Sequence, residues 1–268
     1  MEKEIKNLEK ISKDIRKKVI EMIYMAGSGH PGGSLSCVDI LVSLYNECIN
    51  INLDKYGRRI DKFVLSKGHA APAYYAVLSQ KGFIPEVDLL TLRKYNSYLE
   101  GHPSNKINGV DVSSGSLGQG LSVACGMALA KKISKEEGFV YCLLGDGEMQ
   151  EGQVWEALMS ANKYQLSNLI VFIDFNKLQI DGEVKDVMPI EPLKEKIEAF
   201  KLNVIEINGH SHKEIIDAVN SAKEQDRSTV IICNTIKGKG ISFMENEAKW
   251  HGKAPNDEEY KLAMEELK

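Results

Sequence analysis

The first part of the chain has the hydrophobic spacing of a long amphipathic helix. Apolar residues recur every three or four positions from Leu8 to Ala26, which places them along one helical face. Further on, the chain has short uninterrupted apolar runs, which are typical of strands in a parallel sheet covered on both faces. These runs occur at 63–65, 139–144, 169–173 and 230–233, and residues 204–207, where Glu206 interrupts the apolar residues, are expected to form a further strand. Because segments with helical spacing separate the runs, the pattern predicts an α/β fold.

Polar residues follow two of the apolar runs. Run 139–144 leads into Asp146, within a Gly-Asp-Gly turn, and run 169–173 leads to Asn176. The segment between them, 148–164, has the apolar spacing of a helix, so the order is strand, helix, strand. In a right-handed crossover both strands point the same way. Asp146 and Asn176 are therefore expected at one edge of the sheet, about 4.8 Å apart if their strands are neighbours.

A carboxylate oxygen and an amide oxygen at this separation suit a hard cation. Mg²⁺ and Ca²⁺ prefer oxygen ligands, and Mg²⁺ usually adds phosphate oxygens from a ligand. The carboxyl edge of a parallel sheet is also where open α/β folds bind ligands. The pair therefore predicts a metal site that holds a phosphorylated cofactor. A simple turn after a strand, without a ligand, is the alternative.

Four of the six histidines share one environment, a loop flanked by glycine or proline. They are His30, His69, His102 and His251. Loops positioned by a rigid sheet are common places for binding and catalytic residues, and imidazoles transfer protons near neutral pH. We therefore treat these four as candidate site residues. We interpret His210 and His212 as neighbours of a helix cap, because two histidines without a third ligand make a poor zinc site.

Local motifs predict the start of two helices, and a third motif, a match to the dinucleotide-binding pattern, is rejected. Ser36 with Asp39, and Ser211 with Glu214, have the spacing of capping boxes. Residues 27–32 match the G-x-G-x-x-G pattern of dinucleotide sites, which would favour an NAD-linked oxidoreductase. That fingerprint must follow a strand, whereas this stretch follows a helical pattern and contains a proline. We therefore reject the dinucleotide interpretation.

Composition narrows the class of protein. The 268 residues include 34 Lys and Arg and 38 Asp and Glu, a formal net charge of −4, which argues against a nucleic-acid binder. No apolar run approaches the roughly 20 residues of a membrane helix, and the charged N-terminus lacks the apolar core of a signal peptide. The five cysteines form no C-x-x-C pair, so we expect buried thiols in a cytoplasmic protein. No linker divides residues 1–268, which predicts a single domain.

Six motifs occur in the order expected for transketolase. They are 29–32 (GHPG), 65–70 (LSKGHA), 101–103 (GHP), 115–120 (GSLGQG), 145–152 (GDGEMQEG) and 250–252 (WHG). The chain resembles the N-terminal, diphosphate-binding half of transketolase from its first helix to about Pro255. The resemblance implies a three-layer αβα fold with a mostly parallel sheet. It also implies transfer of a two-carbon ketol unit from a ketose phosphate to an aldose phosphate in the pentose phosphate pathway, with thiamine diphosphate as the electron sink.

The resemblance also implies roles for individual residues. The expected ligands of Mg²⁺ (or Ca²⁺) are Asp146, Asn176 and the backbone carbonyl of Leu178. The residues expected to bind thiamine diphosphate are His69, Gly115, Ser116, Leu117, Gly147, Glu151, Asn176, Ile180 and His251. The expected catalytic imidazoles, which face the substrate, are His30, His102 and His251. Within the cofactor set, Glu151 resembles the glutamate that links paired active sites across a subunit interface.

Two departures from the family pattern matter. Ser116 stands where many relatives have proline, which leaves its loop less rigid. The sequence ends at Lys268, before the pyrimidine-binding domain, whose glutamate activates the cofactor, and before a third domain. We therefore expect one half of a split enzyme, which pairs with a C-terminal subunit in an α2β2 heterotetramer, or else a fragment.

Two alternatives remain at this point. One is a subunit of another thiamine diphosphate enzyme, such as deoxyxylulose phosphate synthase, which fits residues 65–70 less well. The other is a non-catalytic regulatory paralogue, which predicts the loss of ligands or imidazoles that this sequence retains.

Overall fold

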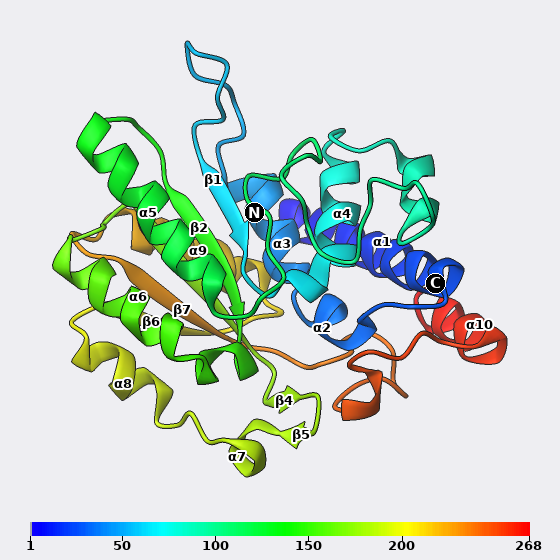
Figure 1. The fold of residues 1–268 in the computed structure, drawn as a ribbon. Coiled ribbons are helices and arrows are strands. Elements are labelled where there is room, and N and C mark those ends of the chain that lie inside the picture. Colours follow the sequence, from blue (N-terminus) through cyan, green and yellow to red (C-terminus); the bar gives the residue numbers. More distant parts are fainter. Residues whose placement is uncertain (1) are drawn as a thin grey trace.

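A five-stranded parallel sheet forms the centre of the protein (Figure 1). The computed structural model describes residues 2–268. The strands, in their order across the sheet, are β1 (Lys62–Leu65), β2 (Val140–Gly145), β3 (Leu169–Phe175), β7 (Thr229–Asn234) and β6 (Asn203–Asn208). Every neighbouring pair of strands is parallel. Each apolar run of the sequence forms one of these strands, which confirms the predicted α/β class.

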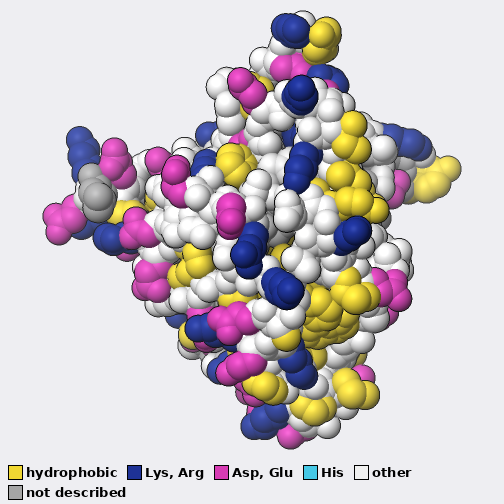
Figure 2. Space-filling model, turned by 90° about the vertical axis from the view of Figure 1, so that its left-hand side faces the viewer, with side chains coloured by type: hydrophobic (Ala, Val, Ile, Leu, Met, Phe, Trp, Pro, Cys, Tyr) yellow, Lys and Arg dark blue, Asp and Glu magenta, His cyan; other side chains and the backbone are white. Residues whose placement is uncertain are grey.

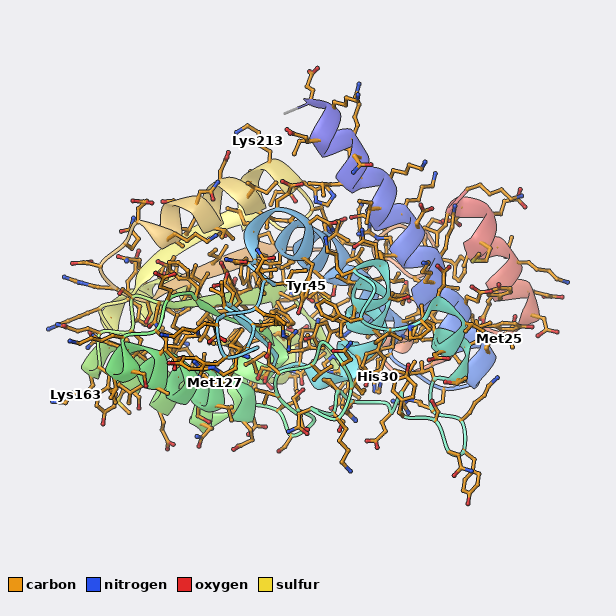
Figure 3. The ribbon with its side chains drawn as sticks, turned by 90° about the horizontal axis from the view of Figure 1, so that it is seen from above. Met25, His30, Tyr45, Met127, Lys163 and Lys213 are labelled. Atoms are coloured by element: carbon orange, nitrogen blue, oxygen red, sulfur yellow. The ribbon has the colours of Figure 1, made fainter. Side chains whose placement is uncertain are left out.

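Helices cover both faces of the sheet, which is why β1, β2, β3 and β7 are almost wholly buried, whereas the edge strand β6 is only partly buried. Along β2, Tyr141 belongs to the core on one face and Cys142 to the core on the other, as the two-residue period of a strand requires. The first face is covered by α1 (Glu2–Ala26), α3 (Val38–Ser43), α4 (Ala71–Gln80) and α9 (His212–Lys223), and the second by α5 (Gln119–Ser134), α6 (Gly152–Lys163) and α8 (Leu193–Ala199). In Figure 3, Lys213 on α9 and Met127 on α5 lie on opposite sides of the sheet.

Short elements connect the strands and helices of these layers. They are α2 (Pro31–Ser36), the π-helical turn η1 (Leu44–Cys48), the 3-10 turns η2 (Gly68–Ala70), η3 (Glu86–Thr91), η4 (Gly147–Gln150) and η5 (Ala248–Trp250), the hairpin of β4 (Leu178–Gln179) and β5 (Gly182–Glu183), α7 (Val184–Val187) and the last helix α10 (Asp257–Glu266). The stretch 27–32 joins α1 to α2 and follows no strand. Its context is therefore wrong for a dinucleotide fingerprint, as the sequence indicated.

Two local predictions are wrong, and a third is only half right. Ser36 and Asp39 do not form a capping box, because α3 begins after Cys37 without a side-chain cap and both side chains bond elsewhere. The helix expected over 148–164 is interrupted at Glu151, which is extended (φ −73°, ψ 127°). The predicted box at Ser211 is half formed: its side chain accepts from the Glu214 N–H at 3.3 Å, while the Glu214 carboxylate accepts from Asn208 instead.

The surface carries charges of both signs. Figure 2 shows one face, on which basic and acidic side chains are interspersed with hydrophobic ones, as the modest net charge leads one to expect. Among the helices of residues 2–268, none has the length and apolar character needed to cross a membrane.

A buried ion pair joins the carboxyl ends of the sheet strands. Lys67, just after β1, bonds Asp174 of β3, and the two residues are 1% and 0% exposed. The Lys67 ammonium also donates to the Gly33 carbonyl at 2.8 Å, and the Asp174 carboxylate accepts from Ser36 Oγ at 2.5 Å and from Thr235 Oγ1. Burial opposes ionisation of Asp174, but Lys67 and these hydrogen bonds hold the pKa of the carboxyl below its usual value. The pair thus binds α2, β1, β3 and the end of β7 together.

Removal of one partner of this ion pair should strongly destabilise the fold. We expect Asp174→Ala to lower the free energy of unfolding by about 3–5 kcal/mol, because it leaves the Lys67 charge buried without compensation. The double variant Lys67→Met/Asp174→Leu should lose less than Asp174→Ala, since no unpaired charge remains. Urea denaturation followed by circular dichroism measures these changes.

The matched control is Asp226→Ala, which removes an exposed carboxylate and should change the unfolding free energy by no more than about 0.5 kcal/mol. Equal losses for Asp174→Ala and Asp226→Ala would contradict the importance of the buried pair.

Candidate functional site

A cavity of about 200 Å³ opens at the carboxyl ends of β1, β2 and β3. Nine residues predicted from the sequence line it: His69, Leu117, Asp146, Gly147, Glu151, Asn176, Leu178, Ile180 and His251. The cavity therefore brings together residues that the sequence spreads over nearly two hundred positions. A larger hollow of about 470 Å³ lies between Trp155, Met188 and Phe200, but its lining is mainly apolar and contains none of the predicted histidines.

Asp146 and Asn176 leave neighbouring strands at the same edge, as predicted. In the register of β2 and β3, Gly145 pairs with Asp174. The Asp146 carboxylate accepts from the N–H of Gly147 at 2.7 Å and from the N–H of Lys177, while Asn176 Oδ1 accepts from the N–H of Leu178 at 3.1 Å. The two side chains thus converge on the turn that follows β3.

The electrostatics of Asp146 fit a bound cation. Burial, followed by the nearby charge of Asp174, raises the pKa of Asp146 to about 7. Among residues 2–268, its hydrogen bonds come from the backbone N–H groups of Gly147 and Lys177, and no ammonium or guanidinium of these residues bonds it directly. A cation in the cavity would favour the ionised form of this carboxyl.

The donor set is the one expected for a hard cation rather than for zinc. In the part of the chain that the structure describes, no cluster of three His, Cys, Asp or Glu side chains is arranged to hold a metal. A metal beside Asp146 would therefore depend on amide and carbonyl oxygens from Asn176 and Leu178, and on oxygens that a ligand brings. Gln179 Nε2, also at the cavity, is buried and has no hydrogen-bond partner within residues 2–268, so a polar ligand would satisfy it.

Three imidazoles form a triangle beside this cavity. The ring centres of His30, His69 and His251 are 5.3–5.4 Å apart, although the residues come from the start of α2, from η2 and from the end of η5. The fourth, His102, lies against Gly115, where an added Cβ would be 3.4 Å from its ring. The structure therefore groups all four candidate histidines around one edge of the sheet.

These imidazoles are held in the neutral form. Burial, assisted by Arg93, lowers the pKa of His30 to about 4, and burial, assisted by Lys237, lowers that of His251 to about 3. The pKa values of His69 and His102 are also lowered, chiefly by burial. His30 Nδ1 is buried without a hydrogen-bond partner among the described residues. Neutral rings at neutral pH are able to accept a proton from a bound substrate.

Lys237 is a site residue that the sequence reasoning missed. It is 2% exposed, and its ammonium donates to the Leu178 carbonyl at 3.0 Å and bonds His251 Nδ1 at 3.0 Å. Burial, together with the charge of Lys67, lowers the pKa of Lys237 to about 8. The surrounding residues 236–240 lack the spacing of a phosphate loop, so no local signal marked this lysine. The Leu178 carbonyl retains a second lone pair for a metal.

Glu148 is a second missed residue, with a structural task. One oxygen of its buried carboxylate accepts from Ser66 Oγ and from the Gly118 N–H at 2.9 Å, and the other accepts from the Gly145 N–H at 3.1 Å. Glu148 thereby ties the 115–118 loop to the ends of β1 and β2. Gly120 must be glycine, because a Cβ there would be 2.4 Å from Ser66 Oγ.

Several predicted cofactor residues lie at the open side of the cavity. Ile180 is 66% exposed and Leu117 is 36% exposed, and Ser116 and Glu151 are exposed as well. Exposed apolar groups beside a polar cavity are typical of surfaces that a ligand or partner covers.

Comparison with known proteins shows the family of the chain. The chain matches the family model described as transketolase, thiamine diphosphate binding domain, over residues 8–267. It is 41% identical over 266 residues to one of the subunits of the apulose-4-phosphate transketolase of Phocaeicola vulgatus, covering 98% of this chain and 95% of that protein. It is 44% identical over 256 residues to a 6-deoxy-6-sulfo-D-fructose transketolase subunit of a Clostridium species, covering 94% of this chain and 93% of that protein.

A solved structure shows the same fold. The transketolase of Campylobacter jejuni superposes with a TM-score of 0.92 at 34% identity, over 98% of this chain. The present chain spans only 43% of the chain of that protein, whereas it spans 95% and 93% of the two subunits above. The chain therefore belongs to the transketolase family and corresponds to its N-terminal, thiamine diphosphate binding part.

Proposed function

We propose that this chain is the cofactor-binding subunit of a two-chain transketolase, which transfers a two-carbon ketol unit from a ketose phosphate to an aldose phosphate. The observation that carries the proposal is the convergence of Asp146, Asn176 and the Leu178 carbonyl with four neutral imidazoles at one sheet edge. The extent of the match to separate subunits, over nearly their whole length, supports the division into two chains. Residues 1–268 would act as one cofactor-binding domain.

Asp146, Asn176 and the Leu178 carbonyl would hold Mg²⁺ or Ca²⁺ together with diphosphate oxygens. The raised pKa of the buried Asp146 supports this assignment, because a cation offsets the unfavourable burial of its charge. The Gly147 N–H, His69 and His251 would hold the diphosphate. Lys237 adds a buried positive charge on the same side.

The opposite end of the cofactor would leave the cavity at its exposed rim. Gly115, Ser116 and Leu117 would contact the aminopyrimidine, and Ile180 would pack beside the thiazolium ring. Exposure of Ile180 and Leu117 supports a role that needs a ligand or a second chain to cover them. Glu151, exposed beside Gly118, would link paired active sites across the subunit interface.

Bound thiamine diphosphate supplies an electron sink for breaking the bond next to a ketose carbonyl. The imidazoles would move the protons. His30, whose buried Nδ1 has no hydrogen-bond partner among the described residues, would accept the proton of a sugar hydroxyl. A Lys237 ammonium can only donate to His251 Nδ1, so the proton of the neutral His251 ring lies on Nε2, which would donate to a substrate oxygen. His102 would act at the entrance.

The partner would be a C-terminal subunit with the pyrimidine-binding and third domains, in an α2β2 assembly. Sugar phosphates would be the substrates. The names of the two subunit relatives indicate that uncommon ketoses should also be tested as donors. Five buried free thiols support a location in the reducing cytoplasm.

Loss of the metal carboxylate should abolish tight cofactor binding. We expect Asp146→Ala to weaken thiamine diphosphate binding about 100-fold or more in the presence of Mg²⁺, because the diphosphate loses its counter-charge. Isothermal titration of the complex with the partner chain measures this, and circular dichroism checks the fold. The control Asp186→Ala removes an exposed carboxylate on α7 and should bind normally. An unchanged dissociation constant for Asp146→Ala would refute the assignment.

The imidazoles should divide into two groups. His30→Ala and His102→Ala should lower kcat by about 10²–10⁴-fold while cofactor affinity stays near normal, as expected for residues that transfer protons. His69→Ala should mainly weaken cofactor binding, and His251→Ala should show both effects. Steady-state kinetics with a ketose phosphate donor, combined with cofactor titration, separates these outcomes. Equal loss of cofactor in all four variants would show that the division is wrong.

The isolated chain should be inactive. Thiamine diphosphate is long and two-ended, and this chain offers one binding edge, which the diphosphate would occupy. The purified chain, produced in a host that lacks transketolase, should bind cofactor weakly and transfer no ketol unit from a ketose phosphate to an aldose phosphate. Addition of the partner subunit should restore both properties. Full activity of the chain alone would overturn the two-chain proposal.

A further inference from the structure

A buried cluster of charged side chains lies outside the cavity, on the face of the sheet that α1 covers. Arg16 of α1 makes a two-pronged contact with Asp39 of α3, with N–O distances of 2.6 and 3.0 Å. His210, in the loop between β6 and α9, bonds the same carboxylate through Nδ1 at 2.7 Å. Arg16 and Asp39 are 8% and 5% exposed. A buried cluster of this kind requires good geometry, because each unpaired charge would be strongly destabilising.

The cluster also forms hydrogen bonds with the backbone of residues 236–239, a segment that follows β7. His210 Nε2 accepts from the Ile236 N–H at 2.9 Å, so the proton of a neutral His210 ring lies on Nδ1, where it is donated to Asp39. Arg16 Nε donates to the Lys239 carbonyl at 3.0 Å. These two hydrogen bonds, one at each end of the segment, are called the two grips below. The Asp39 carboxylate connects them, because it bonds both His210 and Arg16.

Lys237 lies between these two grips. Its backbone carbonyl accepts from the Asn246 N–H at 2.9 Å, and the next N–H, of Gly238, donates to the Gly32 carbonyl at 3.0 Å. The lysine stem passes close to Gly32, where an added Cβ would be 3.0 Å from Lys237 Cγ. A long lysine side chain reaches a fixed point only when its backbone is held, since its free rotamers are many. The segment is held, and the ammonium rests between the Leu178 carbonyl and His251.

We infer that Arg16, Asp39 and His210 form a positioning clamp for Lys237, which sets the place of its ammonium beside the cofactor's diphosphate and fixes the His251 tautomer. The inference rests on the proposed function, in which Lys237 faces the diphosphate. The clamp acts through the 236–239 backbone and touches neither cofactor nor substrate. Loss of one grip lets the segment shift, so that Lys237 no longer reaches both partners.

A plain role in stability is the competing explanation, and His212 provides a matched control. It lies two residues from His210, is 3% exposed, and is 3.8 Å from the same Asp39 carboxylate. Its ring nitrogens bond Ser43 Oγ at 2.7 Å and Ser12 Oγ at 3.2 Å rather than the 236–239 segment. Substitution at His212 therefore disturbs the same region without releasing Lys237.

The test measures thiamine diphosphate binding, with Mg²⁺, by isothermal titration of the complex with the partner subunit, together with the unfolding free energy of each variant. Lys237→Met should weaken binding about 10–100-fold, and His210→Ala should weaken it nearly as much. The double variant His210→Ala/Lys237→Met should bind the cofactor no more weakly than whichever single variant has the lower affinity, because both changes remove the same interaction, that of the Lys237 ammonium. His212→Ala should lower stability but leave the dissociation constant within about twofold of normal.

Arg16→Lys serves as a second variant if His210→Ala fails to fold. It keeps a buried positive charge but lacks the fork that reaches Asp39 and the Lys239 carbonyl at once, so we expect weaker binding with only a modest loss of stability. Additive effects of His210→Ala and Lys237→Met, or equal binding by the His210 and His212 variants, would overturn the clamp. Normal binding by Lys237→Met would instead overturn the proposed role of Lys237 at the diphosphate.

Discussion

The buried ion pair between Lys67 and Asp174 is the interaction on which the rest of the site depends. Neither charge is stable alone at this depth, so each requires the other. Their contact fixes the end of β1 relative to the end of β3, and the middle strand β2 lies between these two. Asp146 follows that middle strand, and Asn176 follows β3. The metal ligands of the proposed site therefore lie where this pair holds the sheet edge.

The same pair sets the charges that surround the cavity. Asp174 adds to the effect of burial in raising the pKa of Asp146, and Lys67 adds to it in lowering the pKa of His69. A cation beside Asp146 and an anion beside His69 and Lys237 would relieve both effects together. This arrangement suits a metal and a diphosphate that bind together, because Mg²⁺ is usually coordinated by phosphate oxygens as well as by protein carboxylates.

Much of the fold was predictable from the sequence, and so was the meeting of Asp146 and Asn176 at one edge of the sheet. Four apolar runs predicted the strands β1, β2, β3 and β7, because burial on both faces leaves a strong local pattern. Asp146 and Asn176 were found because they directly follow two of those runs. Lys67 and Asp174 were not paired in advance, since 107 positions separate them and no spacing rule joins them. Lys237 was missed for the same reason, as its contacts come from distant loops.

The failed capping box shows the same limit. Ser36 and Asp39 have the right spacing, yet Ser36 bonds Asp174 and Asp39 bonds Arg16. Tertiary partners thus replaced the local bonds that the spacing predicted. The individual roles of the histidines remain predictions for the same physical reason, because they depend on a ligand and a second chain as well as on this sequence.

The most direct test is a crystal structure of this chain with its partner subunit, thiamine diphosphate and Mg²⁺. We predict one metal ion bound by Asp146 Oδ, Asn176 Oδ1 and the Leu178 carbonyl at about 2.0–2.1 Å, with diphosphate oxygens completing its shell and the Lys237 ammonium on the same side. A metal held by other residues, or a diphosphate bound away from the ends of β2 and β3, would contradict the proposed site.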